Sequence, residues 1–78
     1  MYYVYILKCS DGTFYKGCTS DLNERIKRHK LGYIKYTQSR LPIELVTYVV
    51  FSERYRAFEF EKYLKSGSGR AFMKKRLI

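Results

Sequence analysis

This chain of 78 residues has little of what marks a secreted or membrane protein. Its only two cysteines, Cys9 and Cys18, form no C-x-x-C motif and are too few for a disulfide scaffold. The longest apolar run, residues 45–51, is interrupted by Thr47 and is far too short to span a bilayer. No signal-peptide segment precedes the strand-like stretch 2–7. We therefore expect a cytoplasmic protein with reduced, buried thiols and no membrane contact.

Acidic residues are also scarce, with 7 Asp and Glu against 16 Lys and Arg, which gives a formal net charge of +9. A surface this positive gains free energy by releasing the counterions of a polyanion, so the surplus favours a nucleic-acid partner. The alternative is that the charge only keeps the chain in solution. The hydrophobic fraction of 46% is ordinary for a folded protein. Because no repeat or linker divides the chain, we expect one domain over residues 1–78.

Two strands are predicted at the start of the chain. Residues 2–7 and 13–18 are rich in aromatic and β-branched side chains and flank the turn Ser10-Asp11-Gly12. A two-residue Asp-Gly turn would pair odd positions with even ones and would place Tyr5 and Tyr15 on opposite faces. A three-residue loop with Gly12 left-handed pairs odd with odd and places both tyrosines on one face. The local sequence allows either geometry.

A helix and a third strand follow. Thr19-Ser20-Asp21 predicts an N-cap for a helix over about residues 21–31, with Glu24 as a capping-box partner. A basic, aromatic loop then leads to a third strand over residues 43–51. The consecutive apolar residues of this strand indicate burial on both faces and a central position in the sheet.

The last third of the chain predicts two helices. Ser52 is expected to cap the first, which ends near Lys65, and the second spans about residues 70–77 with Phe72 and Leu77 inward. The order β-β-α-β-α-α describes a small α+β fold, in which helices flank an antiparallel three-stranded sheet.

Charged side chains fall on the packed face of the first predicted helix. At about 100° per residue, Arg25 and His29 share a face with the apolar Leu22 and Ile26. Four residues of separation make them neighbours, and an arginine fork beside an imidazole can bind a phosphate and assist proton transfer. The alternative is a solvated arginine head and a hydrogen-bonded structural histidine.

Glu61 falls on the apolar face of the next helix, whereas Glu59 falls on the opposite, solvated side. An inward carboxylate near basic residues can hold Mg²⁺, which prefers oxygen ligands and keeps most of its waters. A salt bridge from Glu61 to Arg25 or Lys65 is the equally plausible alternative.

Tyrosine supplies 9 residues and tryptophan none. Tyr5 and Tyr15 lie in the two predicted hairpin strands. A phenol is a weak base at neutral pH unless a cation or metal lowers its pKa. Tyrosine can also stack on bases, as it does in single-strand binding proteins.

Taken together, these residues resemble the GIY-YIG nuclease family. The first motif of the family corresponds to Val4-Tyr5-Ile6 and the second to Tyr15-Lys16-Gly17. Arg25 follows eight residues after Gly17, His29 lies one turn later, and Glu61 stands in a matching helix. Residues 35–37 and 41–46 are similar to the small, single-domain bacterial members. The resemblance covers nearly the whole chain.

The resemblance implies hydrolysis of a phosphodiester bond with one divalent ion, Mg²⁺ or Mn²⁺, held by Glu61. It implies that Tyr5 is the general base, assisted by Tyr15 and His29, and that Arg25 stabilises the pentacovalent phosphate. Which tyrosine is the base stays open. Both tyrosines must then share one side of the sheet, which favours the three-residue hairpin loop.

The implied substrate is DNA, branched or at single-strand/double-strand junctions, in repair or processing. A protein partner could supply specificity, since specificity in this family often comes from appended domains. The candidate contacts to the nucleic-acid backbone are Lys16, Lys35, Tyr36, Arg40, Lys65, Lys74, Lys75 and Arg76.

The chain departs from the family pattern at three points. Val4 replaces the first glycine of the first motif, and Lys16 replaces the central isoleucine of the second. The asparagine that many members carry late in the domain is missing, because Asn23 is the only asparagine, and Ser66 or Ser68 would have to replace it. A nucleic-acid-binding module that cleaves poorly is therefore a second hypothesis. A structural protein with a salt-bridged core network is the third.

Overall fold

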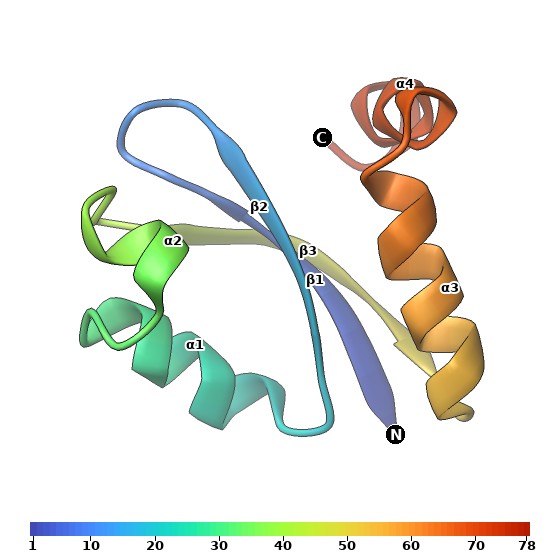
Figure 1. Cartoon of the computed structure of the whole chain (residues 1–78), viewed down its shortest axis with the longest axis horizontal. Helices are drawn as coiled ribbons and strands as arrows, with labels where there is room; N and C mark the ends of the chain where they lie inside the picture. The colour runs from blue at the N-terminus through green and yellow to red at the C-terminus, as the bar shows by residue number, and fades with distance from the viewer.

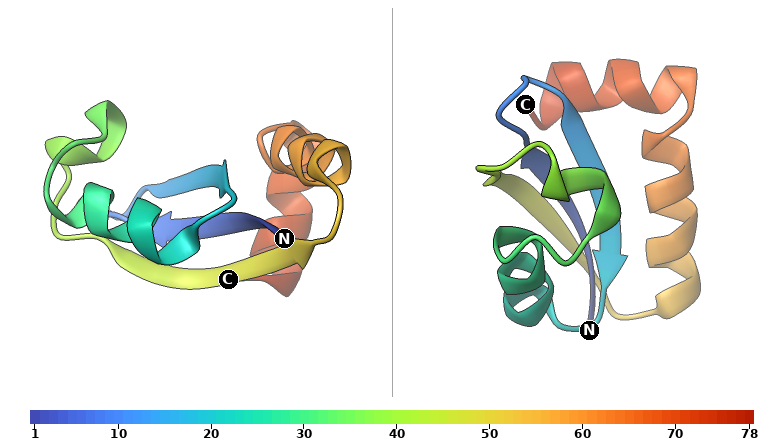
Figure 2. Two further views of the ribbon diagram at one scale, coloured as in Figure 1. Left: turned by 90° about the horizontal axis from the view of Figure 1, so that it is seen from below. Right: turned by 60° about the vertical axis from the view of Figure 1, so that its left-hand side comes forward.

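The computed structural model describes all of residues 1–78 and confirms the predicted order of strands and long helices. Three strands, β1 (Tyr2–Lys8), β2 (Phe14–Thr19) and β3 (Glu44–Phe51), form one antiparallel sheet in the order β2-β1-β3. Helices α1 (Leu22–Lys30) and α2 (Lys35–Gln38) lie on one side of the sheet, and α3 (Arg54–Leu64) and α4 (Gly67–Arg76) lie on the other (Figure 1; Figure 2).

The β1–β2 hairpin has the odd-with-odd register. Tyr5 pairs with Gly17 and Leu7 with Tyr15. Gly12 ends the three-residue loop with a φ of 85°, a conformation that costs glycine little because it has no Cβ. The three-residue loop is therefore confirmed, and the side chains of Tyr5 and Tyr15 stand on the same face of the sheet.

The alternation of side chains along β1 divides the interior into two clusters. Val4 and Ile6 pack with Ala57, Leu64 and Met73 of the α3–α4 layer. Tyr5 and Leu7 pack on the other face with Cys9 and Ile43, against which Tyr15, Leu22, Ile26 and Leu41 are placed. Because side chains of a strand alternate between faces, two of these four consecutive residues face each helical layer.

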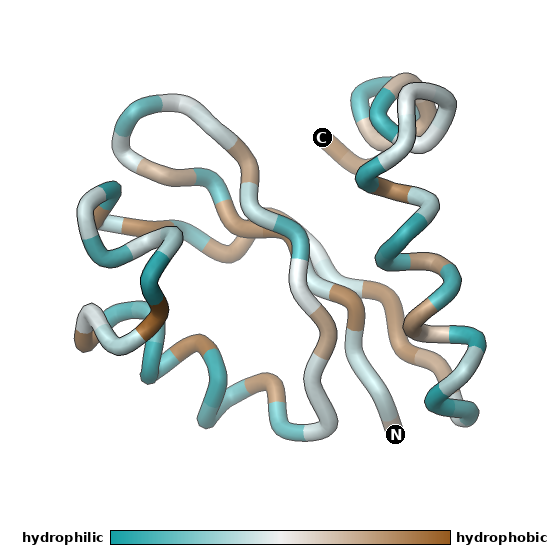
Figure 3. The backbone as a smooth tube through the Cα atoms, in the orientation of Figure 1, coloured by the Kyte–Doolittle hydropathy of each residue, from teal (hydrophilic) through white to brown (hydrophobic).

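Four helices complete the fold: α1 (Leu22–Lys30), α2 (Lys35–Gln38), α3 (Arg54–Leu64) and α4 (Gly67–Arg76). The Asp21 side chain caps α1 by accepting a hydrogen bond from the Glu24 amide, so half of the predicted capping box is present. Hydrophilic and hydrophobic positions alternate along α1 and α3 (Figure 3). None of these helices has the length and hydrophobicity that a membrane crossing requires.

Several expectations about the elements are wrong. The central strand is β1, not β3, and Leu45, Tyr48 and Val50 of the edge strand β3 stay exposed. Glu53, not Ser52, occupies the N-cap position of α3. Helix α4 begins at Gly67, because the Ser66 hydroxyl accepts a hydrogen bond from the Gly69 amide and caps it. The short helix α2 lies inside the segment expected to be a loop.

Candidate active site

A chain of hydrogen bonds links the hairpin to the helices through three side chains that have no solvent exposure. The hydroxyl of Tyr5 lies 2.9 Å from Nε2 of His29, and Nδ1 of His29 lies 2.7 Å from Oγ1 of Thr37. The Thr37 hydroxyl donates in turn to the carbonyl oxygen of Ile34 at 3.4 Å. Strand β1, helix α1 and helix α2 each supply one member.

The order of donors and acceptors in these hydrogen bonds determines the tautomer of His29. Because the Thr37 hydroxyl donates to Ile34, its oxygen accepts from Nδ1–H of His29. Nε2 then carries no proton and accepts a hydrogen bond from the Tyr5 hydroxyl. Burial, reinforced by the positive charge of Arg25, lowers the pKa of His29 to about 4, so the imidazole is neutral at pH 7.

Gly17 makes room for the Tyr5 ring. A Cβ built at Gly17, the register partner of Tyr5, would lie 2.5 Å from Cζ of that ring. Real side chains do not approach so closely, so any larger residue would displace the phenol that His29 binds. The glycine of the Tyr15-Lys16-Gly17 motif is therefore a steric requirement of the tyrosine across the hairpin.

Further aromatic rings extend the site towards the surface. The ring of Tyr15 lies 5.0 Å from that of His29 and 6.2 Å from that of Tyr5, and it also packs 5.3 Å from the ring of Tyr36. The guanidinium of Arg40 covers Tyr36 at 4.1 Å and forms an ion pair with Asp11 at 3.1 Å. Arg40 thus ties α2 to the β1–β2 loop in the free protein.

Arg25 and Glu61 approach this site from α1 and α3. Burial raises the pKa of the Tyr5 phenol well above its ordinary value, and Tyr15 adds to the rise. The Arg25 guanidinium opposes this rise in pKa and the Glu61 carboxylate adds to it, so both charges lie within electrostatic reach of the phenol. Their charges also perturb the Cys18 thiol, whose pKa burial raises. Tyr5, Tyr15 and His29 are thus in contact, and the charges of Arg25 and Glu61 act on the Tyr5 phenol from helices on opposite sides of the sheet.

Glu61 is the carboxylate available to a divalent ion. Its side chain is 17% exposed, whereas Glu59 belongs to the exposed residues, as the helical spacing predicted. Oε2 forms an ion pair with Lys65 at 3.3 Å, which is the alternative partner that the sequence allowed. No group of three or more His, Cys, Asp or Glu side chains gathers in the structure. A single carboxylate fits an ion that takes its other oxygens from water and substrate phosphate, as Mg²⁺ does.

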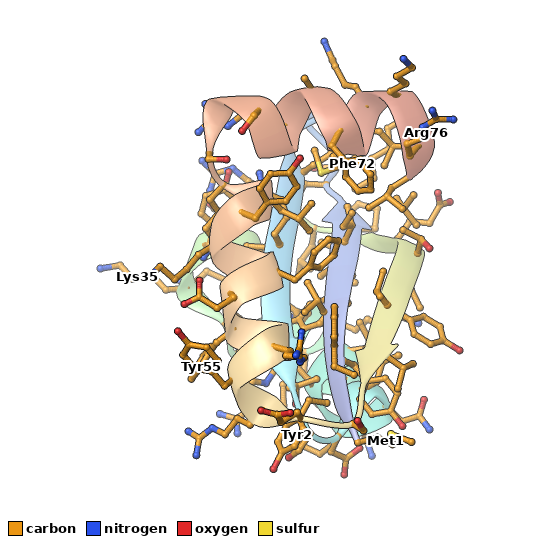
Figure 4. The ribbon with its side chains drawn as sticks, turned by 90° about the vertical axis from the view of Figure 1, so that its right-hand side faces the viewer. Met1, Tyr2, Lys35, Tyr55, Phe72 and Arg76 are labelled. Atoms are coloured by element: carbon orange, nitrogen blue, oxygen red, sulfur yellow. The ribbon has the colours of Figure 1, made fainter.

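The predicted backbone contacts lie on two separate surfaces. Lys35 and Tyr36 are exposed on α2, and Lys74, Lys75 and Arg76 are exposed at the end of α4. Lys35 and Arg76 project in opposite directions (Figure 4). Lys16 lies on β2, which contacts α3, and the charges of Lys65 and Arg70 act on its ammonium group.

Thr37 and Arg70 are the site residues that sequence reasoning missed. Thr37 lies in a segment without helical periodicity, so its complete burial against His29 left no signal in the spacing. Arg70 was expected only as the first residue of the last helix, and the tight packing of Gly69 against Tyr63 and Leu64 brings its charge within reach of Lys16. Ser66, considered as a substitute for the late asparagine, uses its hydroxyl to cap α4.

We expect the stability of the protein to fall as the pH drops from 6.5 towards 4. The pKa of His29 is 6.5 ordinarily and about 4 in the folded chain, so below pH 6.5 the unfolded state binds a proton that the native state excludes. This contribution is complete above pH 6.5 and is lost as the pH falls through 4, at about 1.4 kcal/mol per pH unit at most. Urea unfolding across this range measures the slope. His29→Gln should flatten it, and an unchanged slope in that variant would contradict the assignment.

A family model for the GIY-YIG catalytic domain matches residues 1–76 of this chain. The chain therefore belongs to the GIY-YIG family, a family of nucleases. The resemblance inferred from the motifs is confirmed, as is the three-stranded α+β architecture.

Within this family the chain is similar to UPF0213 proteins. It is 46% identical over 66 residues to the UPF0213 protein CPE1444 of Clostridium perfringens, which covers 83% of this chain and 71% of that protein. It is 39% identical over 70 residues to the UPF0213 protein SAG0778 of Streptococcus agalactiae, covering 88% and 80%. The solution NMR structure of the UPF0213 protein BH0048 from Bacillus halodurans aligns with a TM-score of 0.61 and 38% identity, over 96% of this chain and 84% of that one.

Proposed function

We propose that this protein is a DNA endonuclease that hydrolyses phosphodiester bonds with one divalent ion, Mg²⁺ or Mn²⁺. It selects its substrate by DNA structure or by a weak sequence preference, and it acts in DNA repair or processing. Residues 1–78 act as one domain. The observation that carries the proposal is the hydrogen-bonded pair Tyr5–His29, flanked by the opposite charges of Arg25 and Glu61.

Tyr5 and His29 would act together as the base. The Tyr5 oxygen donates its proton to Nε2 of His29 and keeps lone pairs for an attacking water. As water transfers a proton to the Tyr5 oxygen, the phenol proton moves to Nε2, and the phenol never becomes a free phenolate. This relay suits a tyrosine whose pKa is raised, because His29 ends the step with the positive charge.

Imidazolium is disfavoured at this buried position in the free protein, as the low pKa of His29 indicates. A bound phosphate brings negative charge close to His29 and Arg25 and so favours the protonated imidazole. The hydrogen bond from Nδ1 to Thr37 holds the ring in the required tautomer throughout.

The remaining charges would stabilise the transition state. Arg25 reaches the phosphate as negative charge accumulates on its equatorial oxygens. Glu61 would hold the divalent ion, which supplies charge stabilisation at the leaving 3′ oxygen when bound. Lys65 pairs with Glu61 in the free protein. When the ion takes its place on Glu61, Lys65 would be free to contact a phosphate of the DNA backbone.

A nucleic-acid-binding module that cleaves poorly is the second candidate. The complete burial of Tyr5 and His29 favours it, because a general base must reach the water that it activates. The use of Ser66 as a helix cap also favours it, since no late asparagine is present.

The test is a nicking assay with purified protein on supercoiled and branched DNA. We expect nicked product with Mg²⁺ or Mn²⁺ and none with EDTA, because without the ion no positive charge stabilises the leaving 3′ oxygen and the Glu61 carboxylate repels it. Gel-shift measurements on the same DNA separate the two candidates. Binding without nicking under both metals would replace the nuclease proposal with the second candidate.

A further inference from the structure

One stripe of α3 faces the edge of the sheet formed by β2. Its members follow one another at intervals of four, three and four residues, which places them within about 60° around the helix axis. They are Arg54, Phe58, Glu61 and Lys65. Phe58 is 46% exposed although it borders the buried Ala57, and the guanidinium of Arg54 lies 5.4 Å from the centre of its ring. An exposed aromatic ring therefore lies one turn from the candidate metal ligand.

A hollow lies beside Phe58. Its volume is about 390 Å³, and it is walled on one side by residues 18–20 at the end of β2 and on the other by Arg54 and Phe58. Tyr2 completes the wall and lies below the first turns of α3 (Figure 4). The Arg54 and Glu61 charges both act on the Cys18 thiol in this wall. Phe58, in the wall of the hollow, lies one helical turn from Glu61 in α3, so the hollow is adjacent to the candidate metal ligand.

Lys16 of β2 lies within electrostatic reach of two further cations, Lys65 and Arg70. The side chain of Lys16 points towards α3, because its register partner Ile6 packs with Ala57 and Leu64 on that face. Burial lowers the pKa of Lys16, and the charges of Arg70 and Lys65 lower it further. Lys65 pairs with Glu61 at 3.3 Å, whereas Lys16 and Arg70 form no ion pair, so a bound anion would relieve their mutual repulsion.

We infer that the groove between α3 and β2 binds one unpaired strand of the DNA substrate, with a base stacked on Phe58 in the hollow. The neighbouring phosphate then lies among Lys16, Lys65 and Arg70. This inference rests on the proposed nuclease function and specifies its substrate: DNA with at least one unpaired nucleotide beside the scissile phosphate.

The chemistry of the groove selects an unpaired strand over a duplex. A base within a duplex is stacked on both faces and cannot present one to an aromatic side chain. Stacking on Phe58 therefore needs a nucleotide that is free of its partner, and aromatic platforms in positive grooves bind such nucleotides. Arg54 adds a positive charge beside the ring, and Glu61 is the single acidic member of the stripe.

The absence of tryptophan from the chain permits a direct optical test. Phe58→Trp introduces one fluorophore in the hollow, and Tyr55→Trp introduces one on a more exposed position of the same helix. In EDTA, we expect short oligothymidylate to quench the emission of Phe58→Trp roughly twofold and to leave that of Tyr55→Trp unchanged. A blunt duplex should quench neither. Equal responses of the two variants, or equal quenching by the duplex, would overturn the inference.

Affinity measurements provide a second readout. Phe58→Leu keeps an apolar side chain but loses the stacking surface, so binding of oligothymidylate in EDTA should weaken about tenfold, with Tyr55→Leu as the unchanged control. Lys16→Ala and Arg70→Ala should each weaken binding and lower the salt dependence by about one counterion. The exposed Lys62 and Arg56 supply matched controls, Lys62→Ala and Arg56→Ala.

Equal losses in these variants and in their controls would also overturn the inference. The measurements need no catalysis, so their outcome is independent of the nicking assay. If the protein nicks DNA but Phe58→Trp and Tyr55→Trp respond alike, the groove inference fails and the nuclease proposal stands. If Phe58→Trp alone responds but nicking is absent, the groove binds an unpaired strand in a protein that does not cleave.

Discussion

Glu61→Gln should abolish metal-dependent nicking, with a loss of about a thousandfold or more. The amide keeps the size of the side chain but removes the negative charge that would hold a divalent ion, and such an ion contributes several kcal/mol to the transition state. Binding of DNA in EDTA should persist, because the cations around the groove remain. The measurements are the rate of nicking of supercoiled DNA and the affinity for the same DNA.

Glu59→Gln is the matched control for this substitution. Glu59 lies on the same helix but is exposed and away from the hairpin, so its variant should nick DNA at the normal rate. In Glu61→Gln, loss of the ion pair with Lys65 should lower the free energy of unfolding by no more than about 0.5 kcal/mol. Glu61→Gln that is folded and fully active would contradict the assignment of the metal ligand.

Tyr5→Phe should reduce nicking by about a hundredfold to ten thousandfold, the usual contribution of a general base. The ring still fills the space above Gly17, but it carries no oxygen to receive a proton from water. The same variant leaves Nε2 of the buried His29 without its partner, so we expect a loss of about 1–3 kcal/mol of stability. Single-turnover nicking and urea unfolding measure the two effects separately.

Tyr3→Phe provides the comparison for Tyr5. Tyr3 lies two residues earlier on the same strand and packs edge-on against Tyr48, so it shares the strand environment without the bond to His29. Its variant should change neither rate nor stability appreciably. If Tyr5→Phe loses stability but nicks DNA at the normal rate when folded, the hydrogen bond to His29 is structural and Tyr5 is not the general base.

The hairpin shows how much of the fold can be predicted from local sequence. Strand-forming residues on either side of Ser10-Asp11-Gly12 predicted both strands, but two registers were compatible with them. The family resemblance favoured the register in which Tyr5 and Tyr15 share a face, and the structure has it. Local propensity cannot choose here, because the choice depends on which face the rest of the chain covers.

The strand order shows where sequence periodicity is insufficient. Consecutive apolar residues in β3 predicted a central strand, yet the four successive residues Val4–Leu7 of β1 are the ones buried on both faces. An apolar run indicates that a strand can be buried, but only packing decides which of two such strands is covered. Tyr48 and Val50 remain open at the sheet edge for this reason.

The sequence by itself determined the strands, the long helices and the inward direction of His29 and Glu61, since these follow from spacing along one element. Only the tertiary structure decided that Thr37 completes the hydrogen bonds of His29 and that Gly17 leaves space for the Tyr5 ring. These contacts join segments that the chain brings together only when it folds. Their geometry depends on how the layers pack, and no periodicity along a single element records it.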